Sequence, residues 1–228
     1  MTFKNRCVPK AAIVKPPKMP PFDEKKIHSL LKKYDCPVPY HEVRTRFLGN
    51  IATPAITASP MHIVKGLWGG ELPEFENMDA VNDLVGALIN GLWNSLTRHQ
   101  KRTEPFRLIR TPVEPTRAGL AAYILVRRQE IDGFVEGLFS GQDDIDLPTK
   151  ATASLEIIAQ LGAMLAGADT LVTDETKPSS DVEFARTLKN IQELTPIIER
   201  EINTVVMACT LARRQAMQRP NFSGSTFH

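Results

Sequence analysis

The sequence feature that most constrains the fold is a run of apolar residues with helical spacing between residues 77 and 96. These residues recur at intervals of three and four: Val81, Leu84, Val85, Leu88, Ile89, Leu92, Trp93 and Leu96. This spacing places them along one face of an amphipathic helix that must pack against a larger core. Gly86 and Gly91 lie inside the run, where each costs about 1 kcal/mol, and they predict a close approach of a second helix.

Helical patterns also account for most of the remaining chain. Helix starts are predicted near Asp23, Tyr40, Ser59, Asn77, Thr116, Pro148, Ser180 and Thr195. The last of these, followed by Pro196, predicts a break between two C-terminal helices. No segment of useful length alternates apolar and polar residues as a strand does. The sequence therefore predicts an all-α fold, a compact bundle of about eight helices.

The chain divides into three segments by composition. Residues 1–21 contain five prolines, which favours an extended, disordered basic arm. Residues 22–215 carry the helical patterns and form the predicted domain, and residues 216–228 form a flexible basic tail. Hydrophobic residues make up 42% of the 228 residues, which is enough for the body to bury a sizeable core.

The net charge of +2 conceals an uneven distribution. Both ends are basic and free of acidic residues, so the body between them is acidic. The basic residues of the ends are Lys4, Arg6, Lys10, Lys15, Lys18, Arg213, Arg214 and Arg219. Such residues bind phosphate groups without sequence preference, so they are candidate nucleic-acid contacts. The alternative interpretation is that both ends are simply solvated.

The sequence carries no recognisable arrangement for catalysis or for binding a cofactor or metal. Its three cysteines form no C-x-x-C pair, its histidines are scattered, and it has no phosphate-binding loop. We therefore predict no catalytic, cofactor-binding or metal-binding residue and no enzymatic activity. The absence of a long apolar run and of a signal-peptide core predicts a cytoplasmic protein without a membrane partner.

Residues 66–96 resemble part of a known family. The segment combines Trp68-Gly69-Gly70, Pro73-Glu74-Phe75-Glu76 and a leucine-rich helix that ends near Trp93-Asn94. This combination resembles the YecA/YgfB-like family of bacterial helical proteins, and the similarity covers roughly residues 40–215. The resemblance implies two packed layers of helices in a bacterial cytoplasmic protein, from a family without an enzymatic activity established for it as a class. Some members end in a zinc-binding module rich in cysteine and histidine, which this chain lacks.

The same segment supplies a candidate structural anchor, which consists of Trp68, Pro73, Phe75 and Trp93. Large aromatic residues pack in cores more often than they mark binding sites. The alternative is that Phe75, between two glutamates, is an exposed contact for a partner.

A rigid helical body without catalytic groups works through its surface. We therefore predict a non-enzymatic protein–protein interaction module, an adaptor or regulator with a groove for a helix of an unidentified protein partner. The alternative function is a nucleic-acid-associated protein that binds phosphates through its basic ends. Either function is compatible with a homodimer.

Overall fold

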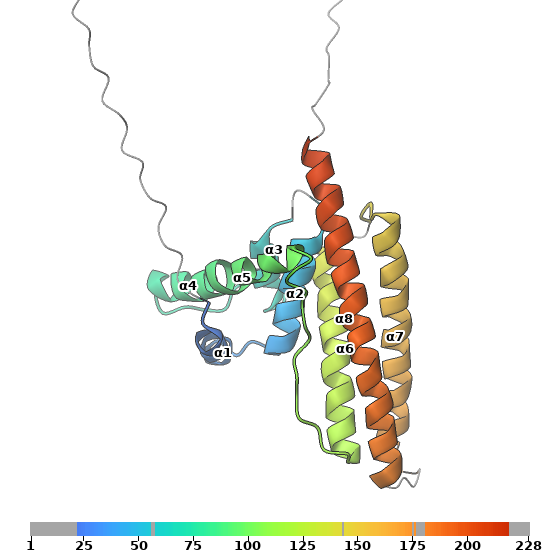
Figure 1. The fold of residues 1–228 in the computed structure, drawn as a ribbon. Helices are drawn as coiled ribbons and strands as arrows, with labels where there is room; N and C mark the ends of the chain where they lie inside the picture. Colours follow the sequence, from blue (N-terminus) through green and yellow to red (C-terminus); the bar gives the residue numbers. More distant parts are fainter. Residues whose placement is uncertain (1–21, 56–57, 143, 175, 177–180, 219–228) are drawn as a thin grey trace, which may run out of the picture.

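The computed structural model describes residues 22–218, apart from residues 56–57, 143, 175 and 177–180. These residues form helices and connecting segments without a β-strand, so the all-α prediction is confirmed (Figure 1). The helices are α1 (Glu24–Lys33), α2 (Tyr40–Ala52), α3 (Pro60–Gly66), α4 (Met78–Val85), the π-helix η1 (Gly86–Trp93), α5 (Asn94–Leu96), the 3-10 helix η2 (Thr97–Gln100), α6 (Arg117–Phe139), α7 (Thr149–Thr173) and α8 (Asp181–Gln218).

Four of the predicted helix starts carry side-chain caps. Asp23, Ser59, Asn77 and Thr116 each accept a hydrogen bond from a backbone amide two or three residues further along. Each bond satisfies an amide that the first helical turn leaves unpaired. These starts are therefore confirmed, whereas Ser180 lies outside the described residues.

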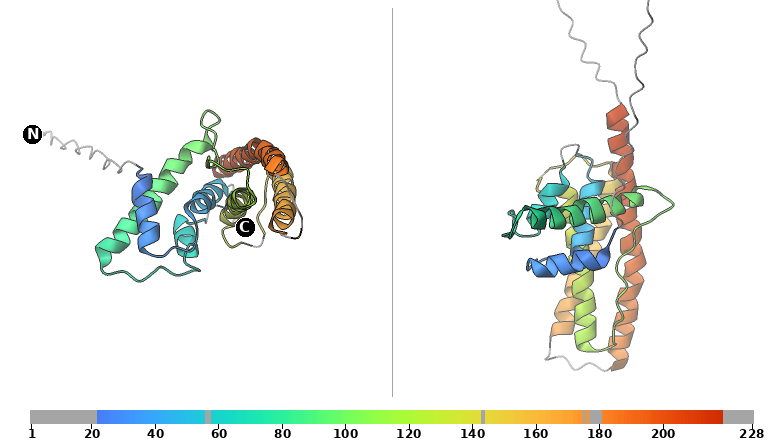
Figure 2. Two further views of the ribbon diagram at one scale, coloured as in Figure 1. Left: turned by 90° about the horizontal axis from the view of Figure 1, so that it is seen from below. Right: turned by 90° about the vertical axis from the view of Figure 1, so that its left-hand side faces the viewer.

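Three long helices, α6, α7 and α8, run side by side, and α2 packs against α6 (Figure 1). The shorter helices α1 and α3 and the segment from α4 to η2 lie across the other side of α2 (Figure 2). We call the unbroken segment from α4 to η2 the rod. Counted in this way, the described residues form seven helical bodies, because α8 replaces the two C-terminal helices that were predicted.

The predicted helix break at Thr195 and Pro196 is wrong, because α8 runs through Pro196 without interruption. Thr195 is buried, and its hydroxyl lies 2.9 Å from the hydroxyl of Tyr123 on α6. Ile191 and Ile198, on either side of the proline, are buried in the same core. This packing offsets the roughly 3 kcal/mol that a proline costs inside a helix.

The rod buries leucines that are spaced four residues apart, namely Leu84, Leu88, Leu92 and Leu96. In a regular α-helix each such step overshoots one turn by about 40°, because a turn takes 3.6 residues. The wider turns of η1 compensate this drift and keep the leucines on one face. The prediction that Gly86 and Gly91 mark a close helix–helix approach is wrong. A Cβ atom placed at either glycine would have only atoms of the rod itself within 4 Å.

The close approach occurs instead between α2 and α6, at three other glycines. A Cβ atom at Gly137 would lie 1.9 Å from the carbonyl oxygen of Arg46, and one at Gly49 would lie 2.2 Å from that of Phe134. A Cβ atom at Gly133 would also come within 2.9 Å of the α2 backbone. The two helices therefore meet backbone to backbone, which only glycine permits.

Replacing Gly137 with alanine should lower the free energy of unfolding by about 3 kcal/mol, because the methyl group forces the two helices apart. Urea denaturation measures this change. The matched control is Gly86→Ala, which adds a methyl group that would meet only the Asn90 side chain, at 4.0 Å, and should change stability by at most about 1 kcal/mol, in the stabilising direction. Equal stability of Gly137→Ala and the unmodified protein would contradict the backbone contact of α2 with α6.

Candidate partner-binding groove

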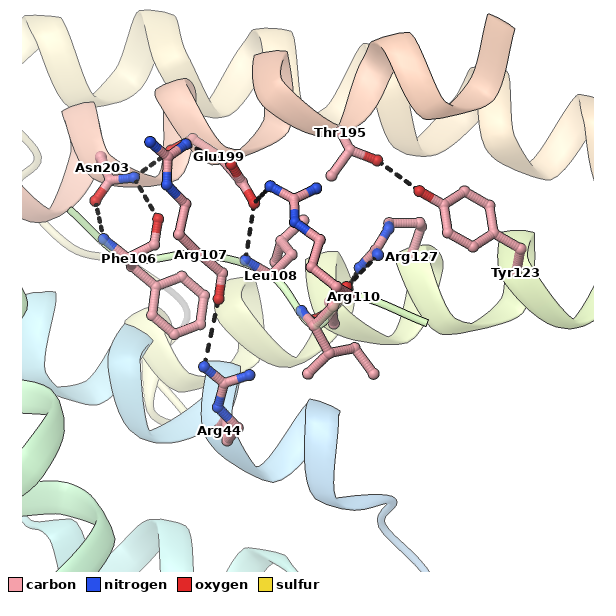
Figure 3. Close-up of polar contacts among 12 residues, drawn as sticks. Arg44, Phe106, Arg107, Leu108, Arg110, Tyr123, Arg127, Thr195, Glu199 and Asn203 are labelled. Carbon is pink, nitrogen blue, oxygen red and sulfur yellow. Dashed lines mark hydrogen bonds and ion pairs between the residues drawn. The ribbon is translucent and has the colours of Figure 1, made fainter. Parts of the chain in front are cut away.

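The connector between η2 and α6, residues 101–116, is held by side chains from three helices (Figure 3). Asn203 of α8 accepts a hydrogen bond from the Phe106 amide at 2.8 Å and donates one to the Phe106 carbonyl at 3.0 Å. Arg44 of α2 donates to the Arg107 carbonyl at 3.3 Å. The connector thus pairs its backbone polar groups with side chains, where a strand would pair them with a neighbouring strand.

We call the side chains that hold the connector the clamp, namely those of Arg44, Arg127, Glu130, Glu199 and Asn203. Glu199 of α8 is its central group (Figure 3). Its side chain is only 1% exposed, yet it forms ion pairs with Arg107 at 2.7 Å and Arg110 at 2.9 Å. Its carboxylate also accepts a hydrogen bond from the Leu108 amide at 3.0 Å. A buried carboxylate is costly unless charged and hydrogen-bonding partners surround it, and the connector supplies all three of these partners.

A buried ion pair on α6 holds the next part of the connector. Arg127 and Glu130 pair one helical turn apart, and both side chains are buried. Arg127 donates to the Ile109 carbonyl at 2.5 Å, and Glu130 accepts from the Ile109 amide at 3.0 Å. Burial raises the pKa of Glu130, while the positive charge of Arg127 opposes that shift. Both polar backbone groups of Ile109 are therefore fixed by one pair of side chains.

The clamped connector forms one wall of a groove with a volume of about 870 Å³. The other walls come from the C-terminal half of α8 and the start of α7. Its basic lining residues are Lys101, Arg102, Arg107, Lys150, Arg200 and Arg214. Its apolar lining residues include Met207, Ala208 and Leu211 of α8. Within the described part of the chain, no aspartate or glutamate lines the groove.

Half of these basic side chains form ion pairs with acidic residues that do not line the groove. The other three, Arg102, Lys150 and Arg214, make no ion pair with any residue that the structure describes. The groove therefore has a net positive charge, and three of its cations remain available to a bound group.

Two polar groups complete the wall. The Thr210 side chain is buried, and its hydroxyl has no hydrogen-bond partner among the described residues. Burial lowers the pKa of His99, and its Nδ1 lies 2.7 Å from the Glu104 carbonyl, as expected for a neutral ring that donates from Nδ1. The positive charge of the groove at neutral pH therefore comes from lysine and arginine.

The residues predicted as the structural anchor do not line this groove, and each of them is half-buried. These residues are Trp68, Pro73, Phe75 and Trp93. The indole N–H of Trp68 donates to the Tyr34 carbonyl at 2.8 Å, and the Phe75 ring lies 5.0 Å from the Tyr34 ring. Trp93 instead donates to Asn50 of α2 at 3.0 Å. The aromatic residues thus hold two separate junctions, one at the end of α1 and one on α2.

The structure describes two of the residues predicted to contact nucleic acid. Arg214 lines the groove. Its neighbour Arg213 is half-buried and donates to the Thr53 carbonyl at the end of α2, at 3.2 Å. The remaining ones lie outside the described residues: Lys4, Arg6, Lys10, Lys15, Lys18 and Arg219.

The connector was not predicted to be part of a site. A signal was present, because residues 98–110 contain five basic residues and one acidic residue. Two further groove cations, Lys150 and Arg200, come from distant helices and carry no such signal.

Among the described residues, no group of three or more histidine, cysteine, aspartate or glutamate side chains is placed to hold a metal ion. No protein-family model matches the chain, and no curated protein or solved structure matches it either. The groove is therefore interpreted from its own geometry and charge.

Replacing Glu199 with glutamine should loosen the connector and lower the free energy of unfolding by about 2 kcal/mol, because two arginines lose their buried counter-charge. Limited trypsin digestion should then cut faster after Arg107 and Arg110. The control is Glu193→Gln, an exposed position on the same helix, which should leave both measurements unchanged. A Glu199→Gln protein as resistant to trypsin as the control would contradict the clamp.

Stability should also fall as the solution becomes acidic. Burial lowers the pKa of His41 and of His99 below the ordinary value of 6.5. Between the lowered and ordinary pKa values the unfolded chain binds more protons, so stability is complete above about pH 7 and is lost as the pH falls through this range. Urea denaturation from about pH 8 to pH 5 measures the loss, which should shrink in a His41→Gln/His99→Gln variant. An equal loss of stability in that variant would show that other groups cause the loss.

Proposed function

We propose that this chain is a non-enzymatic protein-binding module whose groove binds an acidic amphipathic helix of a protein partner. The observation that carries the proposal is the composition of the groove, which six basic side chains and the apolar residues Met207, Ala208 and Leu211 of α8 line together. A helix with acidic residues on one side and apolar residues on the other complements both features.

The dimensions of the groove agree with this occupant. Its lining residues on α8 run from Pro196 to Gln215, which corresponds to about 28 Å at 1.5 Å per residue. A partner helix of about five turns has the same length. The partly exposed Leu211 and its neighbours Met207 and Ala208 offer the apolar contact that such a helix needs.

Nucleic acid is the weaker candidate for the same groove. Its phosphates would pair with Arg102, Lys150 and Arg214, and this binding would depend steeply on salt. Single-stranded nucleic acid also needs aromatic surfaces on which bases stack. Among the described lining residues the sole aromatic ring is that of the buried His99. Membership of the YecA/YgfB-like family would agree with a non-enzymatic role and stays a prediction.

The proposal is tested with a synthetic peptide helix that carries glutamates on one face and leucines on the other. The Arg102→Glu/Arg214→Glu variant should bind this peptide at least about tenfold more weakly than the unmodified protein, because two attractive charges become repulsive. Fluorescence anisotropy measures the dissociation constants. The matched control is Lys189→Glu, an exposed charge reversal on α8 outside the groove, which should bind within about twofold of the unmodified protein.

Two further ligands separate the candidate functions. A scrambled peptide of the same composition keeps the charge but loses the apolar face, so it should bind more weakly than the amphipathic peptide. A single-stranded DNA of equal charge should compete poorly. Equal binding of the scrambled peptide, or displacement of the amphipathic peptide by the DNA, would contradict the proposal and favour nucleic acid.

A further inference from the structure

The loop before the rod and the first turns of α4 form an acidic surface, which we call the acidic tip and which spans residues 71–83. It lies within residues 66–97, the longest stretch of the chain without lysine, arginine or histidine. All the acidic residues of that stretch belong to the tip: Glu71, Glu74, Glu76, Asp79 and Asp83. The tip therefore concentrates negative charge at the start of the rod.

Lysines of α1 neutralise two of these carboxylates. Lys33 pairs with Glu76 at 3.0 Å, and Lys26 pairs with Asp83 at 2.7 Å. The other three side chains are exposed and make no ion pair with any residue that the structure describes, namely those of Glu71, Glu74 and Asp79. The tip thus presents three unpaired carboxylates to solvent, and these attract a positively charged surface.

The tip also presents an apolar side chain on a backbone that is already held in place. Met78 is 71% exposed. Phe75 instead packs against the core, and its ring lies 5.0 Å from the ring of Tyr34 at the end of α1. The Asn77 side chain caps α4 and so fixes where the helix starts. Because these contacts already order the loop, docking it on another molecule costs little further conformational entropy.

These features of the tip complement those of the basic groove. The groove carries three cations without an ion-pair partner among the described residues, and the tip carries three such carboxylates. The groove also exposes Leu211 by 57%, and the tip offers Met78 as its apolar contact. Opposite charges around an apolar contact are typical of two protein surfaces that bind each other.

A molecule cannot place its tip in its own groove. The rod begins at the tip with Met78 and ends at the groove, where His99 is a lining residue and η2 packs against α8. At 1.5 Å per residue, the rod separates these two residues by about 30 Å. Figure 2 shows the rod extending from α8 to the opposite edge of the molecule, where α4 lies. The tip is therefore accessible to a second copy and too far from the groove of its own chain.

A second acidic stretch, the loop between α6 and α7 with Asp144 and Asp146, matches the groove less well. Its described residues expose no large apolar side chain. The tip matches both the charge of the groove and its apolar contact.

We propose that the groove of one copy of this chain binds the acidic tip of a second copy. The inference rests on the proposed function, because it assigns a partner to the same groove. Each contact leaves a free tip on one copy and a free groove on the other, so further copies can add head to tail. Salt should weaken the association, because the paired charges lie at the surface.

Sedimentation of the full chain over a range of concentrations tests the proposal. The mean mass of the unmodified protein should rise with concentration. Glu74→Lys/Asp79→Lys, the tip variant, should raise the dissociation constant of self-association at least about tenfold, because cations then face cations. The matched control is Glu156→Lys/Glu193→Lys, which changes the net charge equally at exposed positions outside the groove and the tip. Its dissociation constant should stay within about twofold of that of the unmodified protein.

Mixing two variants tests whether the tip and the groove contact each other. Arg102→Glu/Arg214→Glu, the groove variant, should also lose self-association. An equimolar mixture with the tip variant should associate again, because each tip then meets a groove of opposite charge on the other variant. This recovery would also show that both variants fold. A mixture that stays monomeric would overturn the proposal.

The amphipathic peptide separates this proposal from the proposed function. The peptide should dissociate the assembled unmodified protein and should bind the tip variant, whose groove is unchanged, with full affinity. A monomeric unmodified protein that binds the peptide would overturn the self-association and leave the proposed function in place. A monomeric protein that does not bind the peptide would overturn both. Self-association that the control weakens as much as the tip variant does would overturn the role of the tip.

Discussion

The structure depends on the backbone contact between α2 and α6. Gly49 and Gly137 leave no side chain between the two helices at their contacts, so carbonyl groups of one helix lie where a Cβ atom of the other would be. Such a contact fixes both the distance and the register of the helices, because no side chain can rearrange to absorb a shift. The same two helices continue into the clamp. Arg44 on α2 and the ion pair of Arg127 with Glu130 on α6 all bind the connector.

The clamp places negative charges inside the molecule and positive charges at its surface. Glu199 and Glu130 lie inside and satisfy amides of the connector. The arginines that neutralise Glu199 stay largely outside, with Arg107 and Arg110 more than 60% exposed. Negative charge therefore points inward and positive charge outward along this edge of the molecule. This arrangement explains how a chain whose middle part is acidic presents a basic groove.

Local sequence predicted what local interactions decide. The helical class followed from apolar spacing, and the capped helix starts followed from side chains that bond amides two or three residues away. The continuous α8 could not be predicted in this way, because Thr195 pairs with Tyr123 on another helix and so does not cap. The glycines were misjudged for the same reason. Gly86 and Gly137 look alike in sequence, and only the position of α2 makes Gly137 indispensable.

The candidate site was the least predictable part. Its cations come from the connector, the start of α7 and the end of α8, which the fold brings together from residues more than 100 positions apart. Of the basic residues expected to act together, Arg214 joins the groove while its neighbour Arg213 holds the end of α2. The side a helical residue faces depends on packing partners that a single sequence does not reveal.

We infer that the connector is a fixed wall of the groove, held there by buried carboxylates. Native-state hydrogen exchange at the amides of Leu108 and Ile109 tests it most directly, because these amides donate to Glu199 and Glu130. Both amides should exchange only through global unfolding, as slowly as the amides at the centre of α6. Exchange as fast as in an unprotected peptide would show that the connector detaches in the native protein and that the groove has no permanent wall.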